Sequence, residues 1–219
     1  MKNLLLLGDS IRMGYDSFVQ EKLQGRANVY YSPENGRFAQ FTLRELSYWK
    51  EVGSWPGMEM DVVHWNNGAW DCMHLNACRG GCPPEEAGEL IVPEGLSGRY
   101  YFDKDPVCPQ EMYRYMLGRV ATRIHQLFPK ARIVFATTTH VIESMAVGAY
   151  RSNAEIEEYN CIAREVLTPR GIRINELGDF AYRHCRDMHP EGDWVHYTDQ
   201  GYELLAGEVV AFLEKEKLI

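Results

Sequence analysis

The chain has 219 residues, which is enough for one domain to bury most of its apolar surface without metal or disulfide crosslinks. Its formal net charge of −8 argues against a broad nucleic-acid-binding or anionic-membrane surface, so we expect neither partner. The apolar run near the start, Leu4 to Leu7, is too short for a signal-peptide core or a membrane span, and we expect a cytoplasmic protein.

Short apolar runs alternate with amphipathic segments along the chain. Strands are predicted over 2–8, 28–32, 61–66 and 132–138, with a weaker one over 171–175. Helices are predicted over 15–23, 42–50, 110–128 and 153–167, and from about 199 onward. Ser152 or Asn153 is expected to cap the fourth helix, and Thr198 the last one. Strands that are apolar almost throughout, separated by helices, predict a three-layer α/β/α sandwich around a doubly wound parallel sheet.

Residues 71–109 break this alternation. The segment contains two adjacent glycines, several prolines and no sustained period, and it is long for a connection. We therefore expect one domain over residues 1–219, with a functional or lid-like loop insertion at about 71–109.

Four of the six cysteines fall in that insertion. Cys72, Cys78, Cys82 and Cys108, with His74 nearby, can be interpreted as a structural zinc site, as free thiols or as a disulfide. Paired Cys-x-x-Cys knuckles are absent. We predict no bound metal and no cofactor.

Residues suited to nucleophilic catalysis stand near the two ends of the chain. Ser10 follows the first predicted strand in Gly8-Asp9-Ser10, where a serine meets the N–H groups of the next helix or merely caps it. Asp193 and His196 precede the last helix three residues apart. A hydroxyl nucleophile needs a base, and the base needs an acid to orient it. The alternative is an ordinary solvated loop.

Together, the Gly-Asp-Ser block and the terminal Asp-x-x-His block resemble the SGNH (GDSL-type) hydrolase family. The resemblance spans almost the whole chain. It implies a five-stranded, flavodoxin-like parallel sheet and an esterase in which Ser10 is the nucleophile, His196 the base and Asp193 its orienting acid.

The two inner blocks of that family match less well. After the second strand, Gly36 is the candidate that donates a backbone N–H to the oxyanion, beside the N–H of Ser10. The third block usually reads Gly-x-Asn-Asp, and Gly68 and Asp71 match its outer positions. Trp70 occupies the Asn position, so Asn67 is the candidate for the missing amide. Trp70 is then a candidate for the substrate pocket.

Three other polar residues are candidates for contact with substrate. His140 follows the fourth predicted strand, at the edge of the sheet where ligands bind, although a histidine there is often structural. Arg12 and Arg151 can bind an anionic or sugar portion of the substrate, or form salt bridges with the many acids.

The family resemblance implies cleavage of small acyl esters, acetyl first, from a small molecule or an oligosaccharide. Aromatic residues make up 12% of the chain, which suits stacking on sugar rings. Two alternatives remain: a thioesterase or lysophospholipase for longer acyl chains, and a carbohydrate-binding relative without turnover.

Overall fold

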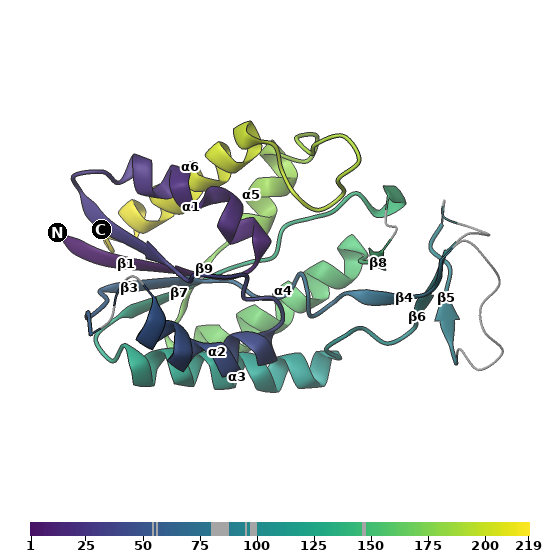
Figure 1. Ribbon diagram of the computed structural model, residues 1–219, viewed down its shortest axis with the longest axis horizontal. Helices are drawn as coiled ribbons and strands as arrows, with labels where there is room; N and C mark the ends of the chain where they lie inside the picture. Colours follow the sequence, from purple (N-terminus) through teal and green to yellow (C-terminus); the bar gives the residue numbers. More distant parts are fainter. Residues whose placement is uncertain (54, 56, 80–87, 95, 97–99, 146–147) are drawn as a thin grey trace.

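The computed structural model describes residues 1–53, 55, 57–79, 88–94, 96, 100–145 and 148–219. Its centre is a parallel sheet of five strands in the order β2-β1-β3-β7-β9 (Figure 1). The strands are β1 (Lys2–Leu7), β2 (Ala27–Tyr31), β3 (Val62–Trp65), β7 (Arg132–Ala136) and β9 (Arg173–Asn175). With the sheet strands counted alone, this is the flavodoxin-like order 2-1-3-4-5, so the predicted fold class is confirmed.

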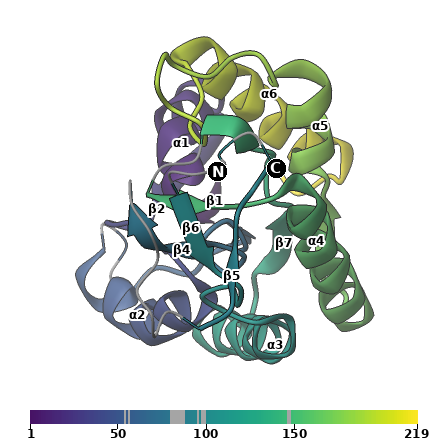
Figure 2. The ribbon, with the colours of Figure 1, turned by 90° about the vertical axis from the view of Figure 1, so that its right-hand side faces the viewer.

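Helices cover both faces of the sheet. One face carries α1 (Ser10–Lys22), α5 (Leu177–His184) and α6 (Asp199–Lys215), and the other carries α2 (Ala39–Val52), α3 (Gln110–Leu127) and α4 (Asn153–Leu167) (Figures 1 and 2). Because successive strand residues point to opposite faces, Leu4 and Leu6 join one apolar cluster and Leu5 and Leu7 the other. All four are at most 1% exposed, which explains why the buried part of the strand is entirely apolar.

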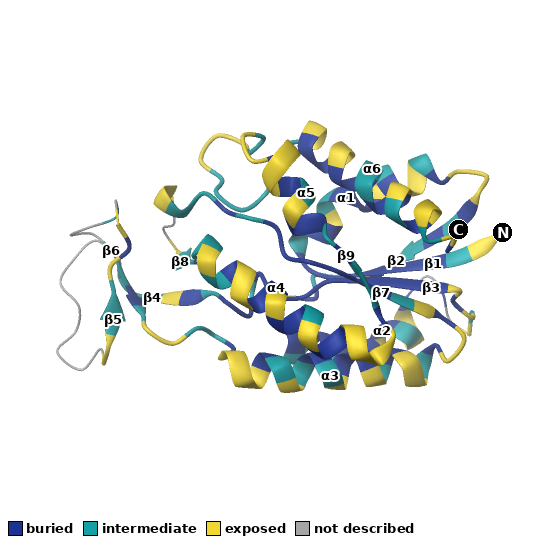
Figure 3. Ribbon diagram, turned by 180° about the vertical axis from the view of Figure 1, so that it is seen from behind, coloured by how far each residue is buried: buried dark blue, intermediate teal, exposed yellow. Residues whose placement is uncertain are grey.

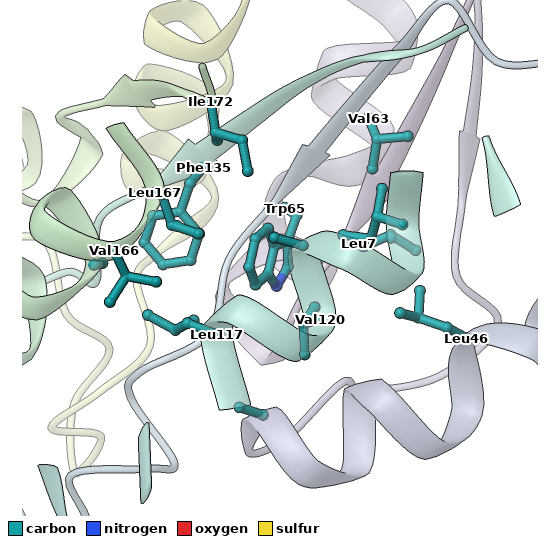
Figure 4. Close-up of a cluster of buried hydrophobic side chains, with 14 of the residues drawn as sticks. Leu7, Leu46, Val63, Trp65, Leu117, Val120, Phe135, Val166, Leu167 and Ile172 are labelled. Carbon is teal, nitrogen blue, oxygen red and sulfur yellow. The ribbon is translucent and has the colours of Figure 1, made fainter. Parts of the chain in front are cut away.

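The cluster beneath α3 and α4 is centred on aromatic side chains. Trp65 of β3 and Phe135 of β7 meet edge to face, with ring centroids 4.9 Å apart, and Leu117 and Val120 of α3 pack near them (Figure 4). This two-sided packing holds the carboxyl ends of the strands in fixed relative positions, which is what a site at that edge requires.

Two helices differ from the predicted ones. Helix α1 begins at Ser10 rather than at residue 15, because the Asp9 side chain accepts a hydrogen bond from Ile11 N and caps it there. The eight-residue helix α5 was not predicted. The caps of α4 and α6 are Ser152 and Thr198, as expected.

Residues 74–103, within the loop insertion predicted at about 71–109, contain regular strands. They include β4 (His74–Arg79), β5 (Leu90–Ile91) and β6 (Tyr100–Asp103), which join β8 (Ala149–Tyr150) in an antiparallel sheet of order β5-β6-β4-β8. We call these four strands the arm. It projects from the side of the molecule where the β-strands of the main sheet end (Figures 1 and 3). Strands this short leave no periodicity in the sequence, and the partner strand β8 lies far along the chain.

Three of the four insertion cysteines lie in the described part of the chain. Cys72 and Cys108 are buried free thiols, and Cys82 lies outside the described residues. Within the described ranges, no three His, Cys, Asp or Glu side chains come together in a way that could hold a metal ion. No described helix is long and apolar enough to cross a bilayer.

Candidate active site

Local backbone geometry places Ser10 at the edge of the main sheet. Strand β1 ends at Leu7, and Ser10 is already the first residue of α1. Gly8 between them has φ +150°, and a Cβ there would lie 1.7 Å from Asn66 Oδ1, so a side chain cannot be accommodated. The turn is therefore tight, and the Ser10 N–H belongs to the free first turn of a helix.

The loop before α6 brings an acid and a base to this serine. His196 Nε2 lies 2.8 Å from Ser10 Oγ, and His196 Nδ1 lies 2.8 Å from Asp193 Oδ2. Asp193 Oδ1 also accepts the backbone N–H groups of Val195 and His196, both at 2.9 Å. The three predicted residues thus form one hydrogen-bonded series.

The charge of Asp193 fixes the proton on the imidazole. Burial alone would raise the pKa of Asp193, but the hydrogen bonds from the His196 and Val195 backbone and from the His196 ring hold it below its usual value. An ionised carboxylate can only accept, so Nδ1 carries the proton and Nε2 is left to accept one from Ser10. This is the arrangement that activates a hydroxyl nucleophile.

A pocket of about 600 Å³ opens in front of Ser10. Its walls include the triad and two of the predicted substrate residues, Trp70 and Arg151. Asn35, Met73 and Trp194 also line it. A second hollow, of about 640 Å³, lies over α3 and α4 and includes none of the triad residues.

The prediction that Gly36 donates to the oxyanion is wrong. Its N–H already donates to the Gly8 carbonyl oxygen at 2.7 Å. A Cβ at Gly36 would lie 2.8 Å from that same oxygen. The glycine is explained by the close approach of two loops, which sequence spacing alone does not distinguish from a role in catalysis.

Asn67 is not an oxyanion donor either. Its side chain is fully buried beneath the sheet edge, where Nδ2 donates to the Arg37 carbonyl at 2.9 Å and to Thr42 Oγ1 at 3.0 Å. Its Oδ1 accepts from Trp65 Nε1 at 2.7 Å. Every hydrogen-bonding group of this amide is occupied within the fold.

Arg12 is also structural. It is 1% exposed, pairs with Asp16 at 2.6 Å and donates to the carbonyl oxygens of Ser32 and Glu34. It does not line the pocket, so the expected contact with substrate is not made. The salt-bridge interpretation is the correct one for this residue.

His140 lies outside the pocket as well. It packs among the rings of Tyr182, His189 and Tyr197, and its Nδ1 is 3.3 Å from the Tyr197 hydroxyl. Burial lowers the pKa of His140 to about 4, which leaves it neutral. It supports the loop that carries His196 and does not reach substrate.

Asn35 is the polar residue that the sequence argument missed. Its Oδ1 accepts from Arg37 N at 2.8 Å, its Nδ2 has no acceptor among the described residues, and the residue lines the pocket. Asn35 immediately precedes Gly36, the residue that was predicted from this segment.

Comparisons with known proteins show the fold of the chain. No family model matches the chain, and no curated protein is significantly similar to it in sequence. A lipase/acylhydrolase from Enterococcus faecalis matches with a TM-score of 0.68 at 18% identity, over 99% of this chain and 97% of that one. A lipolytic protein of the G-D-S-L family from Veillonella parvula matches at 0.56 and 14% identity, over 98% and 100%. The acetyl xylan esterase AlAXEase matches at 0.62 and 15% identity, over 96% and 99%.

These likenesses define a class by structure. The chain has the fold of the esterases and acylhydrolases of the GDSL type. This is the SGNH hydrolase fold that the Gly-Asp-Ser and Asp-x-x-His blocks implied.

Proposed function

We propose that this chain is a serine esterase that removes small acyl groups, acetyl first, from hydroxyl groups of carbohydrates or related small molecules. One observation carries the proposal: Ser10, His196 and Asp193 are joined by two hydrogen bonds of 2.8 Å at the mouth of a pocket. A carbohydrate-binding protein without turnover would not need this series.

The reaction follows from the proton positions. Ser10 Oγ attacks the ester carbonyl carbon while His196 Nε2 takes the hydroxyl proton, and Asp193 stabilises the imidazolium. His196 then returns the proton to the departing alcohol, which leaves an acyl group on Ser10. Water, deprotonated by the same nitrogen, attacks this acyl enzyme and releases the acid.

Two groups are available for the oxyanion. The Ser10 N–H, in the first turn of α1, has no acceptor among the described residues, and the dipole of α1 favours negative charge there. The Asn35 amide is the second donor in this proposal, because Asn35 lines the pocket and its Nδ2 has no partner in the described part of the chain. Each donor of this kind is worth about 2.7–4 kcal/mol of barrier.

The walls of the pocket favour a ring-shaped alcohol. The indole groups of Trp70 and Trp194 both line it, and flat aromatic faces stack well on sugar rings. One structural neighbour is named as an acetyl xylan esterase, which agrees with this choice but concerns another protein.

The first test is hydrolysis of p-nitrophenyl acetate by the protein and by its Ser10→Ala variant. We expect the variant to lose at least about a thousandfold in kcat, because no other group can form the acyl enzyme. Equal activity in both proteins would remove Ser10 from the mechanism. A rate that rises from the acetyl to the octanoyl ester would instead indicate a thioesterase or lysophospholipase.

A further inference from the structure

Arg151 is a buried cation with no acidic side chain at salt-bridge distance among the described residues, and the buried Asp9 carboxyl acts on it only from longer range. Its side chain belongs to a residue that is 5% exposed, and none of the ion pairs between described residues includes it. Its Nε donates to the Ala69 carbonyl, its Nη2 lies 3.2 Å from Met73 Sδ, and its Cζ lies 5.2 Å from the centre of the Trp194 ring. A carbonyl, a thioether and an indole orient the guanidinium but do not neutralise it.

The contrast with Arg12 shows how unusual this is for the chain. Arg12 is equally buried, and the fold supplies it with Asp16 at 2.6 Å. Buried charges in proteins are normally paired, because desolvation is costly. The protein carries 31 Asp and Glu residues, yet it places none of those described within salt-bridge distance of Arg151. Asp9 acts on Arg151 without a direct ion pair, so no described residue supplies an anion that binds the guanidinium directly.

The position of Arg151 in the pocket indicates that the anion is part of a bound substrate. Arg151 lines the same pocket as Ser10 and His196, and no other Arg or Lys among the described residues does. Because Nε donates to the Ala69 carbonyl, the Nη1–Nη2 edge of the guanidinium is the edge available to a ligand. Nη1 has no partner in the part of the chain that the structure describes. Two parallel N–H donors on this edge match the two oxygens of a carboxylate or phosphate.

We propose that Arg151 binds an anionic group of the substrate, so that the preferred ester is one whose alcohol bears a carboxylate or a phosphate, such as an acetylated sugar acid. This inference rests on the proposed function, since it names the substrate class of the same pocket. It assigns Arg151 a role in specificity rather than in bond breaking.

The test compares three acetylated sugars that differ at one group: an acetylated methyl galactosiduronate, its uncharged methyl ester, and the corresponding galactoside 6-phosphate. For the native protein we expect kcat/KM to be roughly ten- to a hundredfold higher on an anionic substrate than on the neutral ester. In Arg151→Met the anionic substrates should lose this factor while the neutral ester changes little. Arg151→Lys should keep part of the preference for anionic substrates, because the positive charge remains while the two parallel N–H donors of the guanidinium are lost.

Arg26→Met is the matched control. Arg26 lies just before β2, at the opposite end of the sheet, and pairs with Glu214 on the surface. The Arg26→Met variant should leave the ratio of kcat/KM on charged and neutral substrates unchanged. The relative rates on carboxylate and phosphate distinguish the two sources of the anion.

Two outcomes would overturn the inference. One is an equal rate for all three sugars in the native protein. The other is a loss of kcat/KM in Arg151→Met that is equal for the charged and the neutral esters and that Arg151→Lys does not restore for either. That result would mean that Arg151 acts at the reacting carbonyl or supports the fold. A binding measurement distinguishes failure of this inference from failure of the proposed esterase function. The Ser10→Ala variant is titrated with methyl galactosiduronate and binding is followed by tryptophan fluorescence. Saturation that is lost when Arg151 is also replaced supports anion binding even if no ester is cleaved.

Discussion

At the scale of single residues, two asparagines illustrate how an amide is committed either to the fold or to the pocket. Asn67 makes three hydrogen bonds inside the protein and is completely buried. Asn35 uses its Oδ1 to fix a turn, lines the pocket in front of Ser10, and leaves Nδ2 without an acceptor among the described residues. The same side chain should therefore respond to mutation in two different ways.

We expect Asn35→Ala to lower kcat by about 10²–10³ with little change in thermal stability, because one oxyanion donor is lost. Asn67→Ala should instead destabilise the fold by on the order of 3 kcal/mol, because it leaves the Trp65 N–H without its acceptor. Steady-state kinetics and denaturant unfolding of both variants, side by side, measure this. A large kcat defect in Asn67→Ala that persists when the protein is fully folded would return that residue to the site.

The positions of Ser10, Asp193 and His196 were predictable because they stand in two short blocks, one just after β1 and one just before α6. The Ser10 N–H was expected as an oxyanion donor too, but Gly36 and Asn67 were wrongly expected, since their partners are distant in sequence: Gly36 meets Gly8, and Asn67 meets Arg37 and Thr42. The same holds for the two arginines. Arg12 and Arg151 look alike in the sequence, and only the position of Asp16 decides which of them is neutralised.

At the scale of elements, one histidine joins the arm to the main domain. His74 of β4 is 1% exposed, with Nδ1 2.8 Å from the Asp103 carbonyl oxygen and Nε2 2.9 Å from Glu155 Oε1 in the first turn of α4. Both partners are acceptors, so both ring nitrogens donate and the imidazole is positively charged. Burial would lower the pKa of His74, but the bonds to Glu155 and Asp103 outweigh it and raise the pKa.

This contact should make the arm sensitive to pH. Because the folded pKa of His74 is raised, its stabilising contribution is complete below the usual histidine value and is lost as pH rises through the raised value. The pKa of Glu155 is lowered because its hydrogen bond to His74 outweighs burial, so its contribution is lost only in strong acid. We expect the arm to lose about 1.5 kcal/mol of stabilisation when the pH rises and His74 loses its charge.

Hydrogen exchange of the β4 and β6 amides, corrected for intrinsic rates, measures this effect. Protection should fall between pH 6 and pH 9 in the native protein and stay level in His74→Gln, whose side chain does not titrate. Protection that is independent of pH in both proteins would show that the His74–Glu155 contact does not hold the arm.

Most strands and helices of the main domain were predictable from their apolar pattern, whereas helix α5 and the strands of the arm were not. The buried part of β1, Leu4 to Leu7, and three of the four residues of β3 are apolar because both faces of these strands are covered. The arm strands are only partly buried where described: β5 has two residues and no buried side chain, and β8 pairs with β4 across about 75 residues. Long-range pairing of short, half-exposed strands leaves little trace in the local sequence.

At the scale of the whole molecule, one buried carboxyl links the stability of the fold to pH. Asp71 is completely buried and its Oδ1 accepts the N–H of Ala39 at 2.9 Å, which anchors the start of α2. Burial raises the pKa of Asp71 to about 7, although the hydrogen bond from Ala39 works against this. Asp71 occupies the last position of the third sequence block, and its role here is to support the sheet edge.

We expect Asp71→Asn to flatten the dependence of global stability on pH. In the unfolded chain the carboxyl loses its proton near pH 4, whereas in the folded chain it keeps it until about pH 7, so the free energy of unfolding falls as pH rises between these values. A difference of about three pH units between the pKa values of Asp71 in the folded and unfolded chain corresponds to a change on the order of 4 kcal/mol in the free energy of unfolding. Asparagine keeps the acceptor for Ala39 and does not titrate.

Denaturant unfolding at pH 5 and pH 8 measures the difference. The stability lost between these two values should be smaller in Asp71→Asn than in the native protein, and unchanged in Asp105→Asn, where the replaced carboxyl is exposed. An identical loss in the two variants would mean that Asp71 is ionised in the folded state.

The pocket is shared between two parts of the chain that have separate structural origins. Ser10 begins α1, and Asp193 and His196 lie in the loop before α6, so all three belong to the main domain. Arg151 directly follows β8 of the arm, and Met73 directly precedes β4. Exchanging the arm for another insertion can therefore redefine which molecule is accepted while the bond-breaking apparatus is inherited intact. For evolution or protein engineering, the arm is the natural place to retarget such a scaffold.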